Sequence, residues 1–199
     1  MKRCVMKISA SPIAQLLRCF GREQRGASAL EFALLAPLML TLYIGCVEIS
    51  DGVAADRKVT LTAGTLANLT SQVTTLVTAD MDNIFAASTA IMNPYTNTVS
   101  AKVSCVKIDA GGGSTVRWGA ATTGTTAHST GEAITIPNDL KTAGVVTYLI
   151  LAEVGYQYVP VTGFSPGFSH IAATGITLSD KMYMAPRIQP PDYNGVQCK

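Results

Sequence analysis

Residues 27–47 read ASALEFALLAPLMLTLYIGCV, a stretch of 21 residues with a single charged side chain, Glu31. As an α-helix this stretch would be about 31 Å long, which matches the hydrocarbon core of a bilayer, about 30 Å thick. A lone segment in lipid must satisfy its own backbone hydrogen bonds, so the stretch predicts a transmembrane helix, which we expect Pro37 to kink. A secretory signal peptide is the alternative, but its apolar run is usually only about 7–15 residues long.

The charges on either side of this stretch predict its orientation. Residues 1–26 carry six Lys and Arg and one Glu, a net charge of +5, whereas the rest of the chain has nine basic and twelve acidic residues, a net charge of −3. A basic segment before an apolar run is retained in the cytoplasm. We therefore expect a basic cytoplasmic leader at 1–26, a transmembrane helix at 27–47 and an extracytoplasmic domain at 48–199, in a single-pass membrane protein. Because the basic residues are scattered, nucleic-acid binding is not expected.

A second pattern lies at the entry to the apolar stretch. Gly26 is followed by four residues, the acid Glu31 and the aromatic Phe32, and this order resembles the processing site of Flp-type prepilins. The longer run RGASALEFALLAPLMLTLYIGCVEISD, residues 25–51, is similar to the start of TadE-like and TadG-like proteins of the Tad pilus system. Two short stretches, YQYVP at 156–160 and MAPR at 184–187, also look like the endings of that family.

This resemblance implies how the N-terminus is processed. In the family a membrane peptidase cuts after the glycine, so cleavage would fall between Gly26 and Ala27 and make Glu31 the fifth residue of the mature chain. Phe32 stands where the family usually has tyrosine. Cleavage creates an ammonium group at Ala27, and the Glu31 carboxylate can neutralise it on the same or a neighbouring chain, which avoids an unpaired charge in lipid. The implied partners are the lipid bilayer, a prepilin peptidase, other pilin-like subunits and the Tad inner-membrane machinery.

Beyond the membrane segment the sequence predicts two helices. One continues from Glu48 and carries a stripe of residues at spacings of three and four, which we expect to face a core. The members of this stripe are Val59, Ala63, Leu66, Thr70, Val73 and Val77. A second helix begins near Asp80, its expected N-cap, and ends at Asn93-Pro94. Asp80 and Asp82 are interpreted as capping residues and not as metal ligands.

The rest of the chain has the patterns of strands and turns. We expect a half-buried strand at 99–105, a glycine turn at 111–114, a strand at 115–118, a mobile loop at 119–131, a short edge strand at 133–137, a central strand at 145–161 and an antiparallel strand at 176–185. A second membrane span is the alternative for 145–161, but its β-branched and aromatic residues favour a strand. The predicted fold class is α+β: a long N-terminal transmembrane helix continues into an amphipathic helix packed on a small antiparallel β-sheet head, as in pilins.

The five cysteines are divided between the expected compartments. Cys4 and Cys19 lie in the leader, Cys46 at the outer end of the span, and Cys105 and Cys198 in the outer domain. Because an oxidising compartment favours disulfides, we expect a bridge between Cys105 and Cys198 in preference to two free thiols. The chain-entropy model gives such a long loop about 4–5 kcal/mol of stabilisation. Cys46 can also pair with Cys46 of another subunit.

The sequence lacks a recognisable set of catalytic or metal-binding residues. The two histidines, His128 and His170, lie in predicted loops and are expected to be exposed. Residues 163–167 fit the G-x-S-x-G string of a nucleophile elbow, but Pro166 has no N–H to serve as the oxyanion donor. Glu153 is expected to face solvent. We therefore predict no enzymatic activity, no cofactor and no metal site.

Together with the resemblance, these patterns predict a structural role. The hypothesis is a minor pilin-like or pilus assembly subunit of a Tad (Flp, type IVb-like) secretion and adhesion system, anchored in the inner membrane. The alternative is an uncleaved single-pass envelope protein with a ligand- or partner-binding periplasmic head, which would retain residues 1–26. A third class, a secreted enzyme or binder, would be a soluble product that starts near residue 48.

Overall fold

A 45-residue helix, α2 (Ala27–Ser71), contains the whole predicted membrane segment and runs through Pro37 without interruption. The predicted helix at 27–47 and its continuation beyond Glu48 are thereby confirmed. The structure, a computed structural model, describes residues 27–95, 99–142, 144–160 and 175–199. The chain divides into two units, Met1–Val47 and Glu48–Lys199, and α2 contributes residues to both. We call the second unit, Glu48–Lys199, the head.

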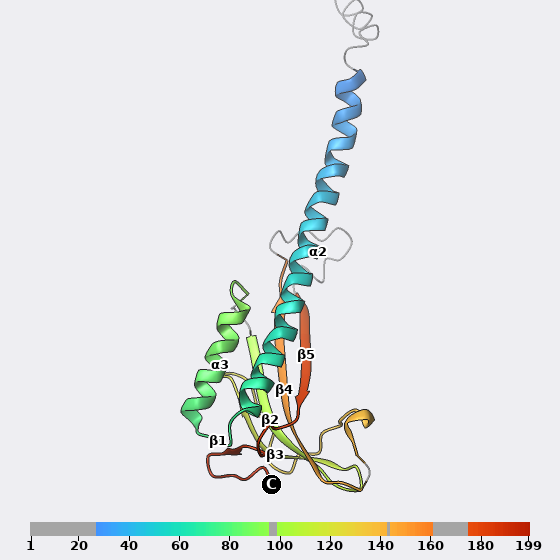
Figure 1. Cartoon of the computed structure of the whole chain (residues 1–199). Helices are drawn as coiled ribbons and strands as arrows, with labels where there is room; N and C mark the ends of the chain where they lie inside the picture. The colour runs from blue at the N-terminus through green and yellow to red at the C-terminus, as the bar shows by residue number, and fades with distance from the viewer. Residues whose placement is uncertain (1–26, 96–98, 143, 161–174) are drawn as a thin grey trace, which may run out of the picture. The chain divides into compact units, whose positions relative to one another are not determined.

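The head is built on a four-stranded antiparallel sheet in the order β3-β2-β4-β5 (Figure 1). Its strands are β2 (Val99–Ile108), β3 (Ser114–Ala121), β4 (Thr147–Tyr158) and β5 (Ile176–Met184). β4 pairs with β2 on one side and β5 on the other, which confirms the predicted central strand and its antiparallel neighbour. The alternative of a second membrane span is therefore wrong. A central strand covered on both faces needs apolar side chains on both, which explains its almost uncharged sequence.

One face of the sheet packs against α3 (Thr78–Met92) and the part of α2 that belongs to the head (Figure 1). Of the predicted stripe, four members are fully buried and confirmed: Val59, Ala63, Leu66 and Thr70. Val73 and Val77 do not belong to it, because α2 ends at Ser71. The Ser71 hydroxyl donates to the main-chain oxygen of Asn68 at 2.8 Å, a local bond that competes with continuation of the helix.

The start of α3 differs from the prediction. Its N-cap is Val77, and Asp80 lies at the third helical position, where its carboxylate accepts the Val77 N–H at 3.2 Å. The prediction that Asp80 is the N-cap is therefore wrong, although Asp80 does make the reciprocal bond of a capping box. The cause is a tertiary contact: the Asn194 side chain accepts the Thr78 N–H at 3.1 Å and donates to the Thr78 hydroxyl at 2.9 Å. The helix ends at Met92, directly before Asn93-Pro94, as predicted.

The opposite face of the sheet has a second core, which the alternating pattern at 99–105 did not predict. Its fully or nearly fully buried members are Val106, Ile108, Val116, Ile136, Leu149 and Leu151. Ile136 comes from residues 122–137, which we call the cover segment; a short 3-10 helix, Asn138–Leu140, follows it. Both faces of β2 and β4 are therefore buried where these strands run beside the second core.

The cover segment follows the edge of β3 and corrects two predictions. Gly131 donates to the main-chain oxygen of Val116 at 2.8 Å, and Ile134 donates to that of Ser114 at 3.1 Å. The predicted mobile loop at 119–131 is wrong at its start, because β3 continues to Ala121. The predicted edge strand at 133–137 is reduced to one isolated bridge, Ala133 to Thr115, because Ile136 turns into the second core.

The C-terminal residues return to the ends of both helices. β6 (Asp192–Tyr193) pairs in parallel with β1 (Thr75–Leu76), which joins α2 to α3. Arg187 donates its main-chain N–H to the Ser71 oxygen at 3.0 Å and its guanidinium to the Asn68 side chain at 2.8 Å. The end of the chain is therefore bound to the helices as well as to the sheet.

Candidate functional site

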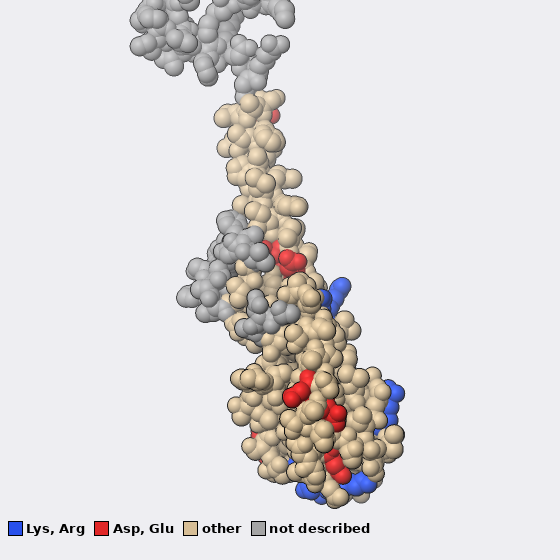
Figure 2. Space-filling model, turned by 90° about the vertical axis from the view of Figure 1, so that its left-hand side faces the viewer, with Lys and Arg blue, Asp and Glu red and all other residues tan. Residues whose placement is uncertain are grey.

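The apolar part of α2 exposes its large side chains. Leu30, Phe32 and Leu34 are 66%, 72% and 71% exposed, and the most apolar 18-residue window of the helix, with a mean hydropathy of 2.0, has no buried residue. On the face drawn in Figure 2 the surface of this segment is almost entirely uncharged. Within the part of the chain that the structure describes, α2 alone is long and apolar enough to cross a membrane. It is therefore the candidate membrane anchor.

The residues predicted to take part in processing lie at the start of this helix. Ala27 is its first residue, and Glu31 and Phe32 are exposed on it, whereas Gly26 lies outside the described residues. The leader cysteines, Cys4 and Cys19, also lie outside them. The structure leaves the predicted cleavage and the role of Glu31 untested.

The first turns of the head's helix are attached to the end of β4. The Tyr158 hydroxyl lies 3.1 Å from the main-chain oxygen of Glu48 and 3.3 Å from its carboxylate. The Tyr158 ring lies beside Gly52, at which an added Cβ would be 3.6 Å from the ring. Burial and the neighbouring Glu48 carboxylate raise the pKa of Tyr158 to about 12, so the phenol keeps its donor proton.

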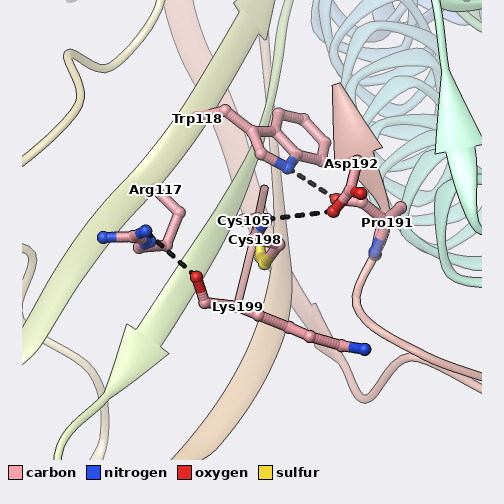
Figure 3. The surroundings of a disulfide bond; sticks show 7 residues. All are labelled: Cys105, Arg117, Trp118, Pro191, Asp192, Cys198 and Lys199. Atoms are coloured by element: carbon pink, nitrogen blue, oxygen red, sulfur yellow. Dashed lines mark hydrogen bonds between the residues drawn. A yellow bond between two sulfur atoms is a disulfide. The ribbon is translucent and has the colours of Figure 1, made fainter. Parts of the chain in front are cut away.

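A disulfide between Cys105 and Cys198 ties the penultimate residue to the centre of the sheet, as the preferred pairing predicted (Figure 3). Their Cα atoms are 6.0 Å apart, and both residues are fully buried. Beside them the Trp118 indole N–H donates to the main-chain oxygen of Pro191 at 2.8 Å. The Trp118 ring packs on Tyr193, with 5.3 Å between centroids. The bridge and the indole together hold the tail on the helix-covered face.

Around the bridge, polar groups fix the last two residues (Figure 3). The Cys198 N–H donates to the Asp192 carboxylate at 3.3 Å, and the Arg117 guanidinium donates to the main-chain oxygen of Lys199 at 3.0 Å. Cys46, the remaining cysteine of the described residues, is exposed on α2 and lies outside the head. Nothing in the structure tests its pairing with another subunit.

An ionic cluster lies on the opposite face of the sheet and overturns two predictions. His128 places Nε2 2.6 Å from a Glu153 oxygen and Nδ1 2.9 Å from a Glu132 oxygen. The other Glu153 oxygen is 2.6 Å from Nζ of Lys181. The side chains of His128 and Glu153 are only 17% and 14% exposed, so the predictions of an exposed His128 and a solvent-facing Glu153 are wrong. The reason is the cover segment, which brings His128 over the sheet.

Each charge in this cluster stabilises its neighbours. Burial lowers the pKa of His128, but hydrogen bonds with Glu153 and Glu132 outweigh it and raise the pKa above its ordinary 6.5. Burial raises the pKa of Glu153, yet hydrogen bonds from Lys181 and His128 leave it below its ordinary 4.5. Bonds from His128 and the Ser129 N–H lower the pKa of Glu132. The imidazolium form of His128 is thus favoured beside two carboxylates.

The described residues give little support for a metal site or a catalytic site. Among the described residues, no three His, Cys, Asp or Glu side chains are placed to hold a metal ion. The G-x-S-x-G string at 163–167 and His170 lie outside the described residues. The lysine, histidine and two glutamates of the ionic cluster are all engaged with one another.

The chain thus combines an exposed apolar helix, the candidate membrane anchor, with an α+β head whose tail is held by a disulfide. Residues 26–67 match the family model described as TadE-like protein. Over these residues the match confirms the resemblance to the TadE/TadG-like family of the Tad system, which is a structural, non-enzymatic pilus family. It spans the apolar segment and most of the head's helix and ends before the sheet. Comparisons with curated proteins and with solved structures gave no match.

The ionic cluster was not predicted from the sequence, although part of its signal was present. Glu153 is the lone acid in an apolar strand, and the antiparallel register places it opposite Lys181. Such a cross-strand pair can be found once the register is known. His128 is different, because its approach to Glu153 depends on the path of the cover segment.

Proposed function

We propose that the chain is a minor pilin-like or pilus assembly subunit of a Tad (Flp, type IVb-like) secretion and adhesion system. The observation that carries the proposal is the TadE-like match at 26–67, which includes the whole exposed apolar part of α2. An apolar helix of this length gains free energy when lipid or other apolar helices cover it. A subunit of a Tad pilus would contact both lipid and the apolar helices of other subunits.

In this proposal residues 1–26 are a basic cytoplasmic leader, residues 27–47 cross the inner membrane, and residues 48–199 form a periplasmic or extracellular domain. The support is the charge asymmetry of the sequence, because basic residues are retained on the cytoplasmic side. A head outside the cytoplasm also suits the Cys105–Cys198 bridge, since disulfides persist in oxidising compartments.

A prepilin peptidase cuts between Gly26 and Ala27, and Glu31 then pairs with the new ammonium group of the same or a neighbouring subunit. Support comes from the position of Glu31, which is exposed on the helix and is the single charged residue of 27–47. A carboxylate in lipid is costly unless it is paired. Docking on other pilin-like subunits and on the Tad inner-membrane machinery would therefore depend on processing.

N-terminal sequencing of the native protein, from cells with and without the prepilin peptidase, tests the proposal. We expect a mature chain that starts at Ala27 only when the peptidase is present. A membrane-bound chain that retains residues 1–26 in both strains would favour the uncleaved envelope protein. A soluble product that starts near residue 48 would point to a secreted binder or enzyme.

The pairing of Glu31 has its own test. We expect Glu31→Ala to reduce pilus output strongly while the chain is still cut at Ala27, because the ammonium group then lacks its partner. Asp56→Ala, which removes an exposed acid from the head's part of α2, is the matched control and should leave pilus output unchanged. Normal pilus output from Glu31→Ala would remove this role.

A further inference from the structure

The ionic cluster lies on the face of the sheet that carries the second core. Its geometry is satisfied by only one protonation state of His128. Both ring nitrogens face a carboxylate oxygen, at 2.6 Å to Glu153 and 2.9 Å to Glu132. An imidazolium donates from both nitrogens, whereas a neutral imidazole has one N–H and one lone pair. In the neutral form, one nitrogen would therefore direct its lone pair at a carboxylate.

His128 is the point at which the cover segment reaches across the sheet. Its main-chain atoms lie against Gly119 of β3, so closely that an added Cβ at Gly119 would be 2.5 Å from the His128 oxygen. Its side chain continues to Glu153 on β4, past the neighbouring strand β2. One side chain thus fastens the segment from the edge strand to the centre of the sheet.

Two buried serine hydroxyls on this face of the sheet lack hydrogen-bond partners, which makes the closed position of the cover segment less stable. Ser104 pairs across the sheet with Gly119 and Leu151, and Ser114 pairs with Ile108, which places both serines on the face of the second core. Neither hydroxyl has a hydrogen-bond partner among the described residues, although both are buried. Opening of the segment would return these hydroxyls to water, so closure depends on the remaining contacts.

We propose that the cover segment is a pH-sensitive latch, closed by the His128 imidazolium between Glu132 and Glu153 and released when His128 loses its proton. The charged groups around His128 come from four neighbouring elements: Glu132 of the cover segment, Glu153 of β4, Lys181 of β5 and Lys102 of β2. The fifth neighbour, β3, presents the uncharged Gly119. Tyr183, on the same face of β5, contributes electrostatically to the raised pKa of Lys181. With His128 protonated, the five charges sum to +1; without its proton they sum to zero, and Glu132 loses its one ion pair.

The direction of the pH dependence follows from the folded and opened states. The pKa of His128 is raised in the closed state, so its contribution to closure is complete below the ordinary value of 6.5 and is lost as pH rises through the raised value. The pKa values of Glu132 and Glu153 are lowered, so their contributions are present above the ordinary 4.5 and are lost as pH falls through the lowered values. Closure is therefore strongest in mildly acidic solution and weakens toward alkaline pH.

Hydrogen exchange of the full chain in detergent micelles, corrected for intrinsic exchange rates, tests the latch. Between pH 6 and pH 8.5 we expect amides at 122–132 to lose protection by about threefold or more, while amides of β2 and β4 keep theirs. His128→Gln should remove this pH dependence and leave the segment poorly protected throughout. His170→Gln, at the chain's other histidine, is the matched control and should keep it.

An NMR titration of His128 tests the latch even if the His128→Gln variant does not fold. In the His170→Gln variant His128 is the single histidine, so its ring signals are assigned without ambiguity. A His128 pKa above 6.5 together with pH-dependent protection supports the latch. A pKa at or below 6.5, or protection of residues 122–132 that is independent of pH, would overturn it.

Discussion

Removal of the bridge between Cys105 and Cys198 should destabilise the head strongly. The bridge closes a loop with a sequence separation of 93, for which the chain-entropy model gives about 4.7 kcal/mol at 25 °C. Residual structure in the unfolded chain reduces this figure, so we expect Cys105→Ala/Cys198→Ala to lose about 4 kcal/mol. With an m-value of about 4 kcal/mol per M in guanidinium chloride, the unfolding midpoint of the head should fall by about 1 M.

The chain carries its own reporter for this measurement. Trp118 is the single tryptophan, and it bonds to Pro191 and packs on Tyr193 of the tail. Its fluorescence during guanidinium unfolding of the full chain in detergent should therefore report release of the tail. Cys46→Ala is the matched control and should unfold like the wild type, because Cys46 lies outside the head.

Two results would refute the reasoning about the bridge. One is a double variant whose unfolding midpoint lies within about 0.2 M of the wild type, since a 93-residue loop cannot contribute so little by loop closure. The other needs no variant: alkylation and mass mapping of the purified protein without reductant should leave Cys105 and Cys198 unmodified. Two alkylated thiols at these positions would show that the bridge is absent.

Two further substitutions test local contacts. Gly119→Ala places a Cβ 2.5 Å from the main-chain oxygen of His128 and should lower the unfolding free energy by about 1–3 kcal/mol. The control, Gly113→Ala, adds a Cβ that meets nothing within 4 Å and should cost much less. Equal losses of unfolding free energy in the two variants would contradict the clash at Gly119. Tyr158→Phe removes the hydroxyl bond to Glu48 and should cost about 1 kcal/mol. An ultraviolet titration should also lose the tyrosine that ionises near pH 12, and a titration curve unchanged in that range would refute the assignment.

Local periodicity predicted much of the fold. The apolar stretch at 27–47, the buried stripe from Val59 to Thr70 and the central strand β4 are read from neighbours within a few residues, and each is confirmed. These elements succeed because burial of one helix face or of both strand faces leaves a repeating mark on the sequence. The end of α2 and the N-cap of α3 were wrong because distant partners decide them: Met184 and Arg187 bond to Ser71, and Asn194 bonds to Thr78.

The second core and the ionic cluster could not be predicted in the same way. Residues 122–137 are rich in Gly, Ala and Thr and contain only two isoleucines, so their pattern predicts nothing beyond the short edge strand at 133–137. Ile136 is the one buried residue of this segment, and its partners Leu149 and Leu151 lie on β4, outside the reach of a local pattern. Where chain path alone brings polar groups together, as for His128 and Glu153, sequence spacing is uninformative.

The bridge joins two residues that lie on either side of β4 and β5 in the sequence. Because Cys198 follows both strands in the chain, it is synthesised after them, so the bridge can form only when every strand of the four-stranded sheet is already available. Oxidation therefore locks a sheet that is already complete, and a cell that lacks an oxidant would accumulate heads whose strands are paired but whose tail is loosely held.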